Sequence, residues 1–403
     1  MFNPFTPGFT DDPYPHYAEL RASEPVEHNE LGFWALWRHR DVSEVLRAKM
    51  SVEDAKVTNQ GPMANAYADA YAEHGIEGDG QSMLDRDPPD HTRLRKLVSQ
   101  AFTPRTIERL TPVVQQLVDD ALDQMDDEGK VDLIDALAFP LPFTVISVML
   151  GMPETDTTRL RELSHTVVRS LEPVPDEATV REIVAAQIGL TELASDAIAW
   201  KRANPADDLL TALINAEDSG DVLSDDELVA QVILLYVAGH ETTVNLIGNG
   251  TLALLRDREQ LDLWRNRPDL DDNAVEELLR FDSPVQMSRR VTLEDYPIDD
   301  GVDGHTIPAG SFVIASLASA NRDESQYGDD AHRLRVDRDN ARQHVSFGAG
   351  VHHCLGAALA RLEGRVAVSS LIRRFPDLDL AGEPQWNGRI NLRGLAAFPV
   401  RVR

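Results

Sequence analysis

The most informative part of this sequence is the stretch Phe347-Gly-Ala-Gly-Val-His-His-Cys-Leu-Gly356. It contains Cys354, the only cysteine of the 403-residue chain, and continues into Ala-Ala-Leu-Ala-Arg-Leu-Glu, a run of good helix formers. Cys354 is therefore predicted to lie at or just before a helix N-terminus, where unpaired backbone N–H groups and the helix dipole favour a thiolate. The glycines allow the backbone to turn toward the sulfur and allow a flat ligand to come close.

Four chemical roles are open to such a cysteine. It can be an inert core residue, a nucleophile paired with a histidine that is adjacent in space, a zinc ligand, or the axial thiolate of a haem iron. Zinc fits poorly, because His352 and His353 are crowded beside Cys354 and there is no clear fourth ligand. A haem thiolate agrees with the glycines, the helix start and the single cysteine, which also excludes an intramolecular disulfide.

A second unusual segment lies in the longest predicted helix, residues 225–256. This helix begins with the capping-box pattern Ser224-Asp-Asp-Glu227, and its residues 228–235 are apolar on nearly all sides, which predicts burial. The run leads into His240-Glu-Thr-Thr243, whose carboxylate and hydroxyl groups need partners if they are buried. The segment is either a satisfied polar patch at a helix crossing or part of a site. It is not a zinc-protease motif, because residue 244 is valine.

Four segments, in this order, resemble motifs of the cytochrome P-450 monooxygenases, specifically the soluble bacterial type. They are His91-Thr-Arg-Leu-Arg95, Ala238-Gly-His-Glu-Thr242, Glu277-Leu-Leu-Arg280 and the cysteine stretch. The resemblance implies a mainly α fold with small β-sheets and a long central helix over the haem, as a single domain covering residues 1–403. It also implies a haem-dependent monooxygenase that hydroxylates or epoxidises a lipophilic small molecule.

The resemblance assigns roles to residues of this sequence. Cys354 is expected to bind the iron of haem b, and Glu241 and Thr242 to deliver protons. Further haem contacts are expected from His91, Arg95, Ala238, Arg290, Phe347, Gly348, His352 and Gly356, with Arg289 as the alternative to Arg290. Glu277 and Arg280, three residues apart on one helix, are expected to form a buried ion pair, with Arg333 as its third member.

Substrate contacts are expected from the central helix and from three other regions. They are Leu235, Ala238, Gly239, Val285, Met287, Leu392 and a lid formed by the long loop 51–87. These segments are mostly apolar, which favours a bulky substrate such as a steroid, terpenoid, polyketide or fatty acid.

Composition limits the class of partner. There are 39 basic and 68 acidic residues, so the net charge is −29, which makes nucleic-acid binding by bulk electrostatics improbable. The sequence contains no run of about 20 apolar residues and no visible signal peptide, so a soluble cytoplasmic monomer is expected. Residues 333–374 nevertheless contain eight arginines and three acids, a local charge of +5, which predicts a basic docking face for an acidic ferredoxin near Cys354.

Periodicity and capping signals predict a mainly helical chain with β pieces near both ends. Helices are expected at 16–22, 40–48, 87–102, 104–127, 140–150, 155–170, 176–202, 207–217, 225–256, 272–281 and 355–375. A β-hairpin is expected from 25–28 and 33–37, with further strands around 290, at 296–298 and at 312–318.

Two other functions compete with monooxygenation. A peroxide-driven peroxygenase of this family lacks the acid–threonine pair, and Glu241-Thr242 argues against it. A haem-binding sensor or carrier needs neither a proton relay nor a long lid, and both are expected here.

Overall fold

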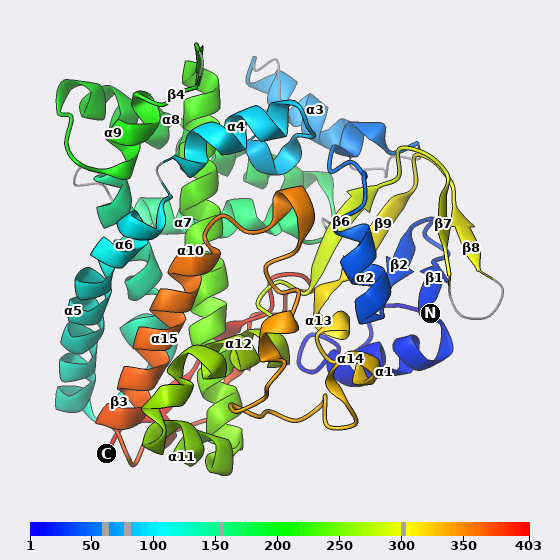
Figure 1. Ribbon diagram of the computed structural model, residues 1–403. Coiled ribbons are helices and arrows are strands. Elements are labelled where there is room, and N and C mark those ends of the chain that lie inside the picture. Colours follow the sequence, from blue (N-terminus) through cyan, green and yellow to red (C-terminus); the bar gives the residue numbers. More distant parts are fainter. Residues whose placement is uncertain are drawn as a thin grey trace. The chain divides into compact units, whose positions relative to one another are not determined.

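The computed structural model describes residues 1–58, 64–75, 82–100, 102–152, 157–173, 175–218, 220–299 and 304–403 (Figure 1). Contacts within the chain define two compact units. Unit 1 comprises residues 1–51, 111–142 and 241–403, and unit 2 comprises residues 52–110 and 143–240. The helices α5 (Pro104–Glu128) and α10 (Asp225–Arg256) contribute residues to both units. Each unit therefore draws on segments that alternate along the sequence.

The main β-sheet belongs to unit 1 and has the strand order β1-β2-β9-β6. The predicted N-terminal hairpin is confirmed, because β1 (Val26–His28) pairs antiparallel with β2 (Trp34–Leu36). Gly32, with a φ of +87°, occupies the left-handed conformation that the turn requires. β2 then pairs in parallel with β9 (Phe312–Ser316), which pairs antiparallel with β6 (Met287–Val291), so the blue and yellow strands lie side by side in Figure 1.

Shorter strands of unit 1 form smaller sheets. β7 (Tyr296–Ile298) pairs with β8 (His305–Ile307), and β11 (Gln385–Trp386) pairs with β12 (Leu395–Ala397). β13 (Pro399–Arg401) lies between β10 (Asp379–Leu380) and β3 (Lys130–Asp132). The C-terminal end of the chain is thus tied to a strand that follows α5.

The helices of unit 1 include α1 (Tyr14–Ser23), α2 (His39–Val45), α11 (Arg258–Asn266), α12 (Asp271–Phe281), α13 (Leu317–Ala320), α14 (Glu324–Tyr327) and α15 (Ala357–Arg374). Glycines let two of them, α12 and α15, pack closely against the second half of α10. A Cβ at Gly250 of α10 would lie 2.6 Å from Cδ1 of Leu278 on α12. A Cβ at Gly364 of α15 would lie 2.7 Å from Cδ2 of Leu246 on α10. Figure 1 shows α15 in orange beside α10 in green, so the helix that follows the cysteine stretch packs against the helix that contains Glu241 and Thr242.

Unit 2 is mostly helical. Its helices include α3 (Ala64–Glu73), α4 (Asp90–Ser99), α6 (Pro140–Leu150), α7 (Thr157–Val167), α8 (Glu177–Ala203) and α9 (Leu209–Ile214), and β4 (Glu217–Asp218) pairs with β5 (Asp221–Val222). The long helix α8 packs against α7, where a Cβ at Gly189 would lie 3.1 Å from Leu163. It also packs against α3, where Val180 and Val184 form an apolar cluster with Ala70. Asp176 caps α8 by accepting a hydrogen bond from the backbone of Thr179.

Most predicted helices are confirmed within a few residues, and the errors concern short elements. Residues 51–87 are not only loop, because α3 forms there and its small alanines conceal its amphipathic character. The helix α11 was not predicted, because a single residue, its N-cap Asp257, separates it from α10. The predicted strand 312–318 ends early, because Ser316 caps α13. Residues 59–63, 76–81, 101 and 155–156 of the predicted elements lie outside the described residues.

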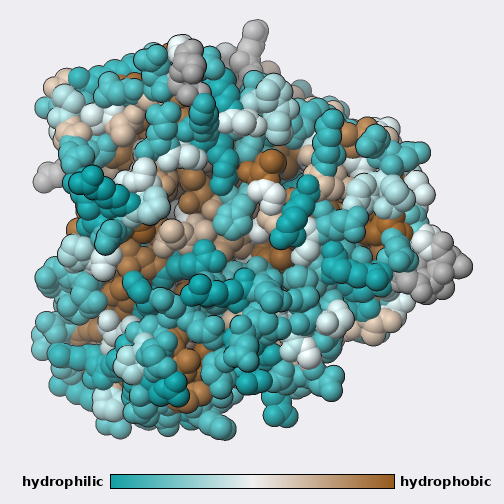
Figure 2. All heavy atoms as spheres, viewed as in Figure 1, coloured by the Kyte–Doolittle hydropathy of each residue, from teal (hydrophilic) through white to brown (hydrophobic). Residues whose placement is uncertain are grey.

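The surface agrees with the strongly charged composition. Hydrophilic residues cover most of the face seen in Figure 2. No described helix combines the length and the apolar character needed to cross a bilayer.

Candidate active site

The cysteine stretch forms a closed loop directly before α15. The backbone N–H of Cys354 donates a 2.9 Å hydrogen bond to the carbonyl oxygen of Phe347, which folds the stretch back on itself. Gly348 and Gly350 have φ angles of +66° and +71°, which favour glycine, and a Cβ at Gly350 would lie 2.5 Å from the carbonyl oxygen of Leu46. The predicted position of the cysteine before the helix is confirmed, since α15 begins three residues after Cys354.

The loop fits a haem iron by the chemistry of its donor and by its shape. The side chain of Cys354 is exposed rather than buried, so the inert-core interpretation is wrong. A Cβ at the neighbouring Gly356 would meet no atom within 4 Å, so this side of the loop leaves room for a flat group. His352 and Phe347 are half-buried on the same loop. A thiolate in such a cradle is a suitable axial ligand, and haem bound there would supply the iron that activates dioxygen.

The predicted capping box of α10 is confirmed, and the polar segment lies farther along the same helix. Ser224 and Glu227 form the capping box, because the backbone N–H of Ser224 donates to Glu227 at 2.9 Å and that of Glu227 donates to Oγ of Ser224 at 3.2 Å. His240 is buried, and its ring packs edge-on against Phe143 at 5.8 Å between centroids. The helix continues without interruption through Thr243. The imidazole of His240 thus belongs to the core of unit 2.

Glu241 forms an ion pair that the sequence did not predict. Its Oε1 binds Nη1 of Arg389, which lies in the loop between β11 and β12. Both side chains are largely buried, with 12% and 9% of their surfaces exposed. The carboxylate of Glu241 therefore has a fixed cationic partner 148 residues away in sequence. Arg389 stands among polar residues in Asn387-Gly-Arg-Ile-Asn391, where nothing in the sequence marks it as the partner of an acid.

A second buried carboxyl group, Glu363, lies on α15 and was also missed. Burial raises its pKa to about 8, although a hydrogen bond with the hydroxyl group of Thr243 opposes this shift. Its Oε2 has no hydrogen-bond partner among the described residues. Glu363 therefore holds a proton near neutral pH. Its partner Thr243 is the next residue after the Glu241–Thr242 pair. An acid within the apolar repeat of the final helix was the only signal available in the sequence.

The predicted ion pair of Glu277 and Arg280 is present and fully buried. Arg280 donates two hydrogen bonds to Glu277, at 2.6 and 2.8 Å. The third member is Arg338, whose Nε lies 3.1 Å from Glu277, and not Arg333. The side chain of Arg333 is exposed, and its contribution is a carbonyl oxygen that accepts hydrogen bonds from Arg280 and Arg338. The chain turns between these two arginines, so spacing in sequence could not identify the inward-pointing one.

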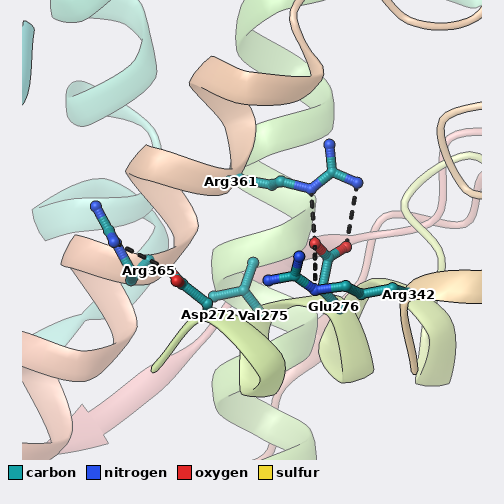
Figure 3. A pocket seen from close by; sticks show the side chains of 6 residues that line it. All are labelled: Asp272, Val275, Glu276, Arg342, Arg361 and Arg365. Carbon is teal, nitrogen blue, oxygen red and sulfur yellow. Dashed lines mark hydrogen bonds and ion pairs between the residues drawn. The ribbon is translucent and has the colours of Figure 1, made fainter. Parts of the chain in front are cut away.

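Most arginines of the predicted basic face are already paired with acids. Figure 3 shows Arg361 and Arg342 directed toward Glu276 of α12, and Arg365 directed toward Asp272. Burial opposes ionisation of Glu276, but hydrogen bonds from His344 and Arg361 outweigh it and lower its pKa to about 2. Three more ion pairs join Arg335 to Asp330, Arg373 to Asp271 and Arg374 to Asp123. Pairing thus removes much of the positive charge that the sequence predicted for this face.

Arg342 is the most exposed member of this cluster. Its side chain is 66% exposed and approaches Glu276 only at 3.9 Å, whereas Arg361 and Arg365 are 37% and 38% exposed. Arg342 also lines a surface pocket of about 410 Å³ together with Arg47, Phe347, Gly348 and His353. The pocket borders the cysteine loop, so the exposed positive charge near Cys354 is concentrated there.

The predicted propionate ligands are distributed over both units. His91 and Arg95 lie four residues apart on α4 of unit 2, where burial and the nearby Arg95 lower the pKa of His91. Arg290 of β6, in unit 1, is buried, and its guanidinium donates to Oγ of Ser288 at 2.9 Å. Arg289 is its neighbour on the strand and therefore lies on the opposite face of the sheet.

The predicted substrate residues of unit 1 come together in part. An antiparallel bridge joins Val285 to Leu392, which are 107 residues apart in sequence, and Met287 follows two residues later on β6. In unit 2, Leu235 is buried on α10, and a Cβ at Gly239 would make ordinary contact with Ile146 at 3.7 Å. Ala238 lies between them on the same helix.

Comparison with known proteins agrees with this geometry. The family model "Cytochrome P450" matches residues 32–266 and 265–385. Cytochrome P450 107B1 of Saccharopolyspora erythraea is 44% identical over 406 residues, covering 98% of this chain and 96% of that protein. The vitamin D(3) 25-hydroxylase of Pseudonocardia autotrophica is 41% identical over 407 residues, covering 99% and 96%. The solved structure of the bacillaene polyketide synthase cytochrome P450 PksS from Bacillus subtilis 168 matches with a TM-score of 0.87 and 36% identity, covering 100% of both chains. The chain belongs to the cytochrome P450 family and is a haem monooxygenase with the mainly α fold of that family.

Proposed function

We propose that this enzyme inserts one oxygen atom into a C–H bond of a bulky lipophilic molecule, with electrons from NAD(P)H carried by a ferredoxin reductase and a ferredoxin. Substrate, dioxygen, two electrons and two protons then give the hydroxylated product and one water. The adjacent acid and hydroxyl of Glu241 and Thr242 carry this proposal. Hydrogen peroxide already contains both electrons and both protons, so an enzyme that uses it needs no proton supply. The supply of NAD(P)H and reduced ferredoxin places the reaction in the cytoplasm.

The cofactor is haem b, with Cys354 as the ligand of its iron. His91, Arg95, Arg290 and His352 hold its propionate groups by charge and hydrogen bonding. Further contacts come from Phe347, Gly348, Gly356 and Ala238. The exposed thiol and the open space beside Gly356 support this assignment.

Carbon monoxide bound to the reduced protein tests the thiolate ligand. The purified protein is expected to show the strongly red-shifted Soret band that a thiolate gives, and Cys354→Ser is expected to lose it together with monooxygenation. A band of the histidine type in freshly purified wild-type protein would contradict the assignment.

Glu241 and Thr242 move the protons. The carboxylate of Glu241 receives a proton from water, and Oγ1 of Thr242 passes it toward dioxygen at the closed site. Two protons are needed for each turnover, so a relay that returns to its starting state is required. The burial of Glu241 limits its exchange with bulk water, which supports a directed transfer.

The substrate contacts Leu235, Ala238, Gly239, Val285, Met287 and Leu392; the expected lid, residues 51–87, lies partly outside the described residues. The bridge between Val285 and Leu392 supports a shared apolar wall. A vitamin D(3) hydroxylase and a polyketide synthase P450 are among the similar proteins. Polycyclic or macrocyclic lipids, namely steroid-like and polyketide molecules, are therefore the first substrates to examine.

The electron donor docks beside Cys354, at the pocket lined by Arg47 and Arg342. Acidic ferredoxins are attracted to exposed positive charge, and this attraction acts mainly on the association rate. Arg342 is more exposed than Arg365, which is paired with Asp272. This supports a docking role for Arg342 rather than for Arg365.

Two assays test the overall proposal. A library of steroids, macrolides, terpenoids and fatty acids is titrated into the purified haem-containing protein, and a true substrate is expected to change its visible absorption spectrum. The best binder is then incubated with NAD(P)H, reductase and ferredoxin, or with hydrogen peroxide alone. Product formation with the ferredoxin system supports the proposal, whereas efficient turnover with peroxide only would replace it with peroxygenation.

A further inference from the structure

One face of α10 is matched to the loop between β11 and β12. Glu241, Asn245 and Asn249 lie at intervals of four residues, so their side chains share this face. A Cβ at Gly394 would lie 1.8 Å from Oδ1 of Asn245, so the loop approaches the helix as closely as glycine allows. Nδ2 of Asn249 donates a 3.0 Å hydrogen bond to the carbonyl oxygen of Arg393. The ion pair of Glu241 with Arg389 completes this face.

The loop is internally braced so that Arg389 has a defined position. Asn387 receives a hydrogen bond on Oδ1 from the backbone N–H of Arg389 at 3.0 Å, and its Nδ2 donates to the carbonyl oxygen of Leu392 at 2.9 Å. Its backbone N–H donates to Gly394 at 2.9 Å. Gly388, with a φ of +71°, supplies the turn between Asn387 and Arg389. These contacts within the loop fix the backbone of Arg389 independently of its contact with Glu241.

The guanidinium engages the carboxylate at one point rather than two. Nη1 of Arg389 binds Oε1 of Glu241, while Nη2 is buried and has no hydrogen-bond partner among the described residues. Arginine–carboxylate pairs are frequently bidentate, with two parallel hydrogen bonds, and this pair is not. A single contact fixes the direction of the carboxylate and leaves its second oxygen outside the ion pair.

We propose that Arg389 is a positioning residue that holds the Glu241 carboxylate in the orientation needed for proton delivery. This inference depends on the proposed function of Glu241 and adds the residue that controls it. Arg389 touches neither dioxygen nor substrate in this role. Without it, the Glu241 carboxylate loses its fixed direction and can recruit disordered water. Dioxygen, two electrons and two protons then leave as hydrogen peroxide, and the substrate is not oxidised.

The test compares Arg389→Gln, Arg389→Lys, Glu241→Gln and the double variant Arg389→Gln/Glu241→Gln. Arg21→Gln is the matched control, because Arg21 is 6% exposed, pairs with Glu324 and also has one buried nitrogen without a partner among the described residues. Product and peroxide are measured per NAD(P)H consumed in the ferredoxin system. Arg389→Gln is expected to lower the yield of product about 10-fold, since a misplaced catalytic group costs about that much or more. Arg389→Lys is expected to restore most of the yield, and Arg21→Gln is expected to retain the wild-type yield.

The double variant separates positioning from general damage. If Arg389 acts through Glu241, the double variant has the same yield as Glu241→Gln alone. Thermal unfolding of the same holoproteins gives a second readout that needs no turnover, in which Arg389→Gln lowers the midpoint less when Glu241 is already Gln. Wild-type coupling in Arg389→Gln, or an undiminished effect in the Glu241→Gln background, would overturn the inference. Failure of the wild-type protein to hydroxylate with ferredoxin would instead overturn the proposed function.

Discussion

Unit 1 contains buried carboxylates in two regions, and the two regions differ in how many hydrogen bonds each carboxylate accepts. On α12, Glu277 is fully buried and receives hydrogen bonds from Arg280, from Arg338 and from the backbone of Arg335. Beside α10, Glu241 has a one-point contact with Arg389, and Glu363 leaves one oxygen without a partner among the described residues. A carboxylate whose oxygens accept several hydrogen bonds from arginines and backbone can move only if that network breaks. We therefore expect substitutions in the α12 cluster to act mainly on stability and substitutions in the α10 region to act mainly on product formation.

The α12 cluster should give the largest effect on stability. Glu277→Gln removes the charge between Arg280 and Arg338 and leaves two buried cations without a full partner. We expect a loss of about 3–5 kcal/mol in the free energy of unfolding, measured by denaturant titration. Asp337→Asn, which alters an exposed acid on the segment between Arg335 and Arg338, is the control and is expected to change little. A stable Glu277→Gln variant with impaired coupling would reverse the assignment of the two regions.

Substitutions in the α10 region should instead lower product formation without changing the free energy of unfolding. Thr242→Ala is expected to bind substrate and consume NAD(P)H but to release peroxide, because losing one positioned proton donor typically costs about 10²–10⁴ in the step that it serves. Thr242→Ser is expected to retain product formation. The control is Thr251→Val, which removes a buried hydroxyl farther along the same helix. Unchanged yield of product per NAD(P)H in Thr242→Ala would show that the hydroxyl group is structural.

Glu363 should make stability depend on pH in the opposite sense to an ordinary ion-paired acid. Its pKa is raised to about 8, so the folded protein retains a proton that the unfolded chain loses above about pH 4.5. Stability therefore decreases as pH rises from about 4.5 to about 8. Relative to wild type, Glu363→Gln is expected to gain on the order of 2–4 kcal/mol between pH 5 and pH 8.

The measurement for Glu363 is the unfolding midpoint of both proteins across that pH range. Groups that titrate in both proteins cancel in the difference. Glu383→Gln, at an exposed glutamate, is the control and should track the wild-type protein at every pH. A constant difference between wild type and Glu363→Gln would mean that Glu363 is ionised throughout.

The smallest effect is expected at the surface next to the α12 cluster. Arg342→Glu is expected to slow reduction by ferredoxin a few-fold at about 0.05 M salt, and the difference should vanish near 0.5 M, where the Debye length is only a few ångströms. Arg365→Glu is expected to have less effect, because Asp272 already compensates Arg365 at 3.0 Å. Stopped-flow reduction measures both rates. Equal rates for wild type and Arg342→Glu at low salt would place the docking surface elsewhere.

Features that arise from contacts between residues close together in the chain could be predicted from the sequence. The capping box of Ser224 and Glu227, the hairpin turn at Gly32 and the position of Cys354 before α15 all follow from contacts a few residues long. Local backbone geometry and side-chain chemistry are sufficient for these features. The order of the four motifs was likewise readable from the sequence, and it led to the correct family.

Ion pairs between residues far apart in the chain could be identified only from the folded structure. The choice of Arg338 over Arg333, the contact of Arg389 with Glu241 and the pairing of Arg361 with Glu276 join segments separated by 61, 148 and 85 residues. In the sequence, every arginine carries the same charge, so the residue type does not indicate which acid it contacts. Its partner depends on where the whole chain places it and on which buried acid would otherwise remain uncompensated, because a buried charge without a partner is strongly unfavourable.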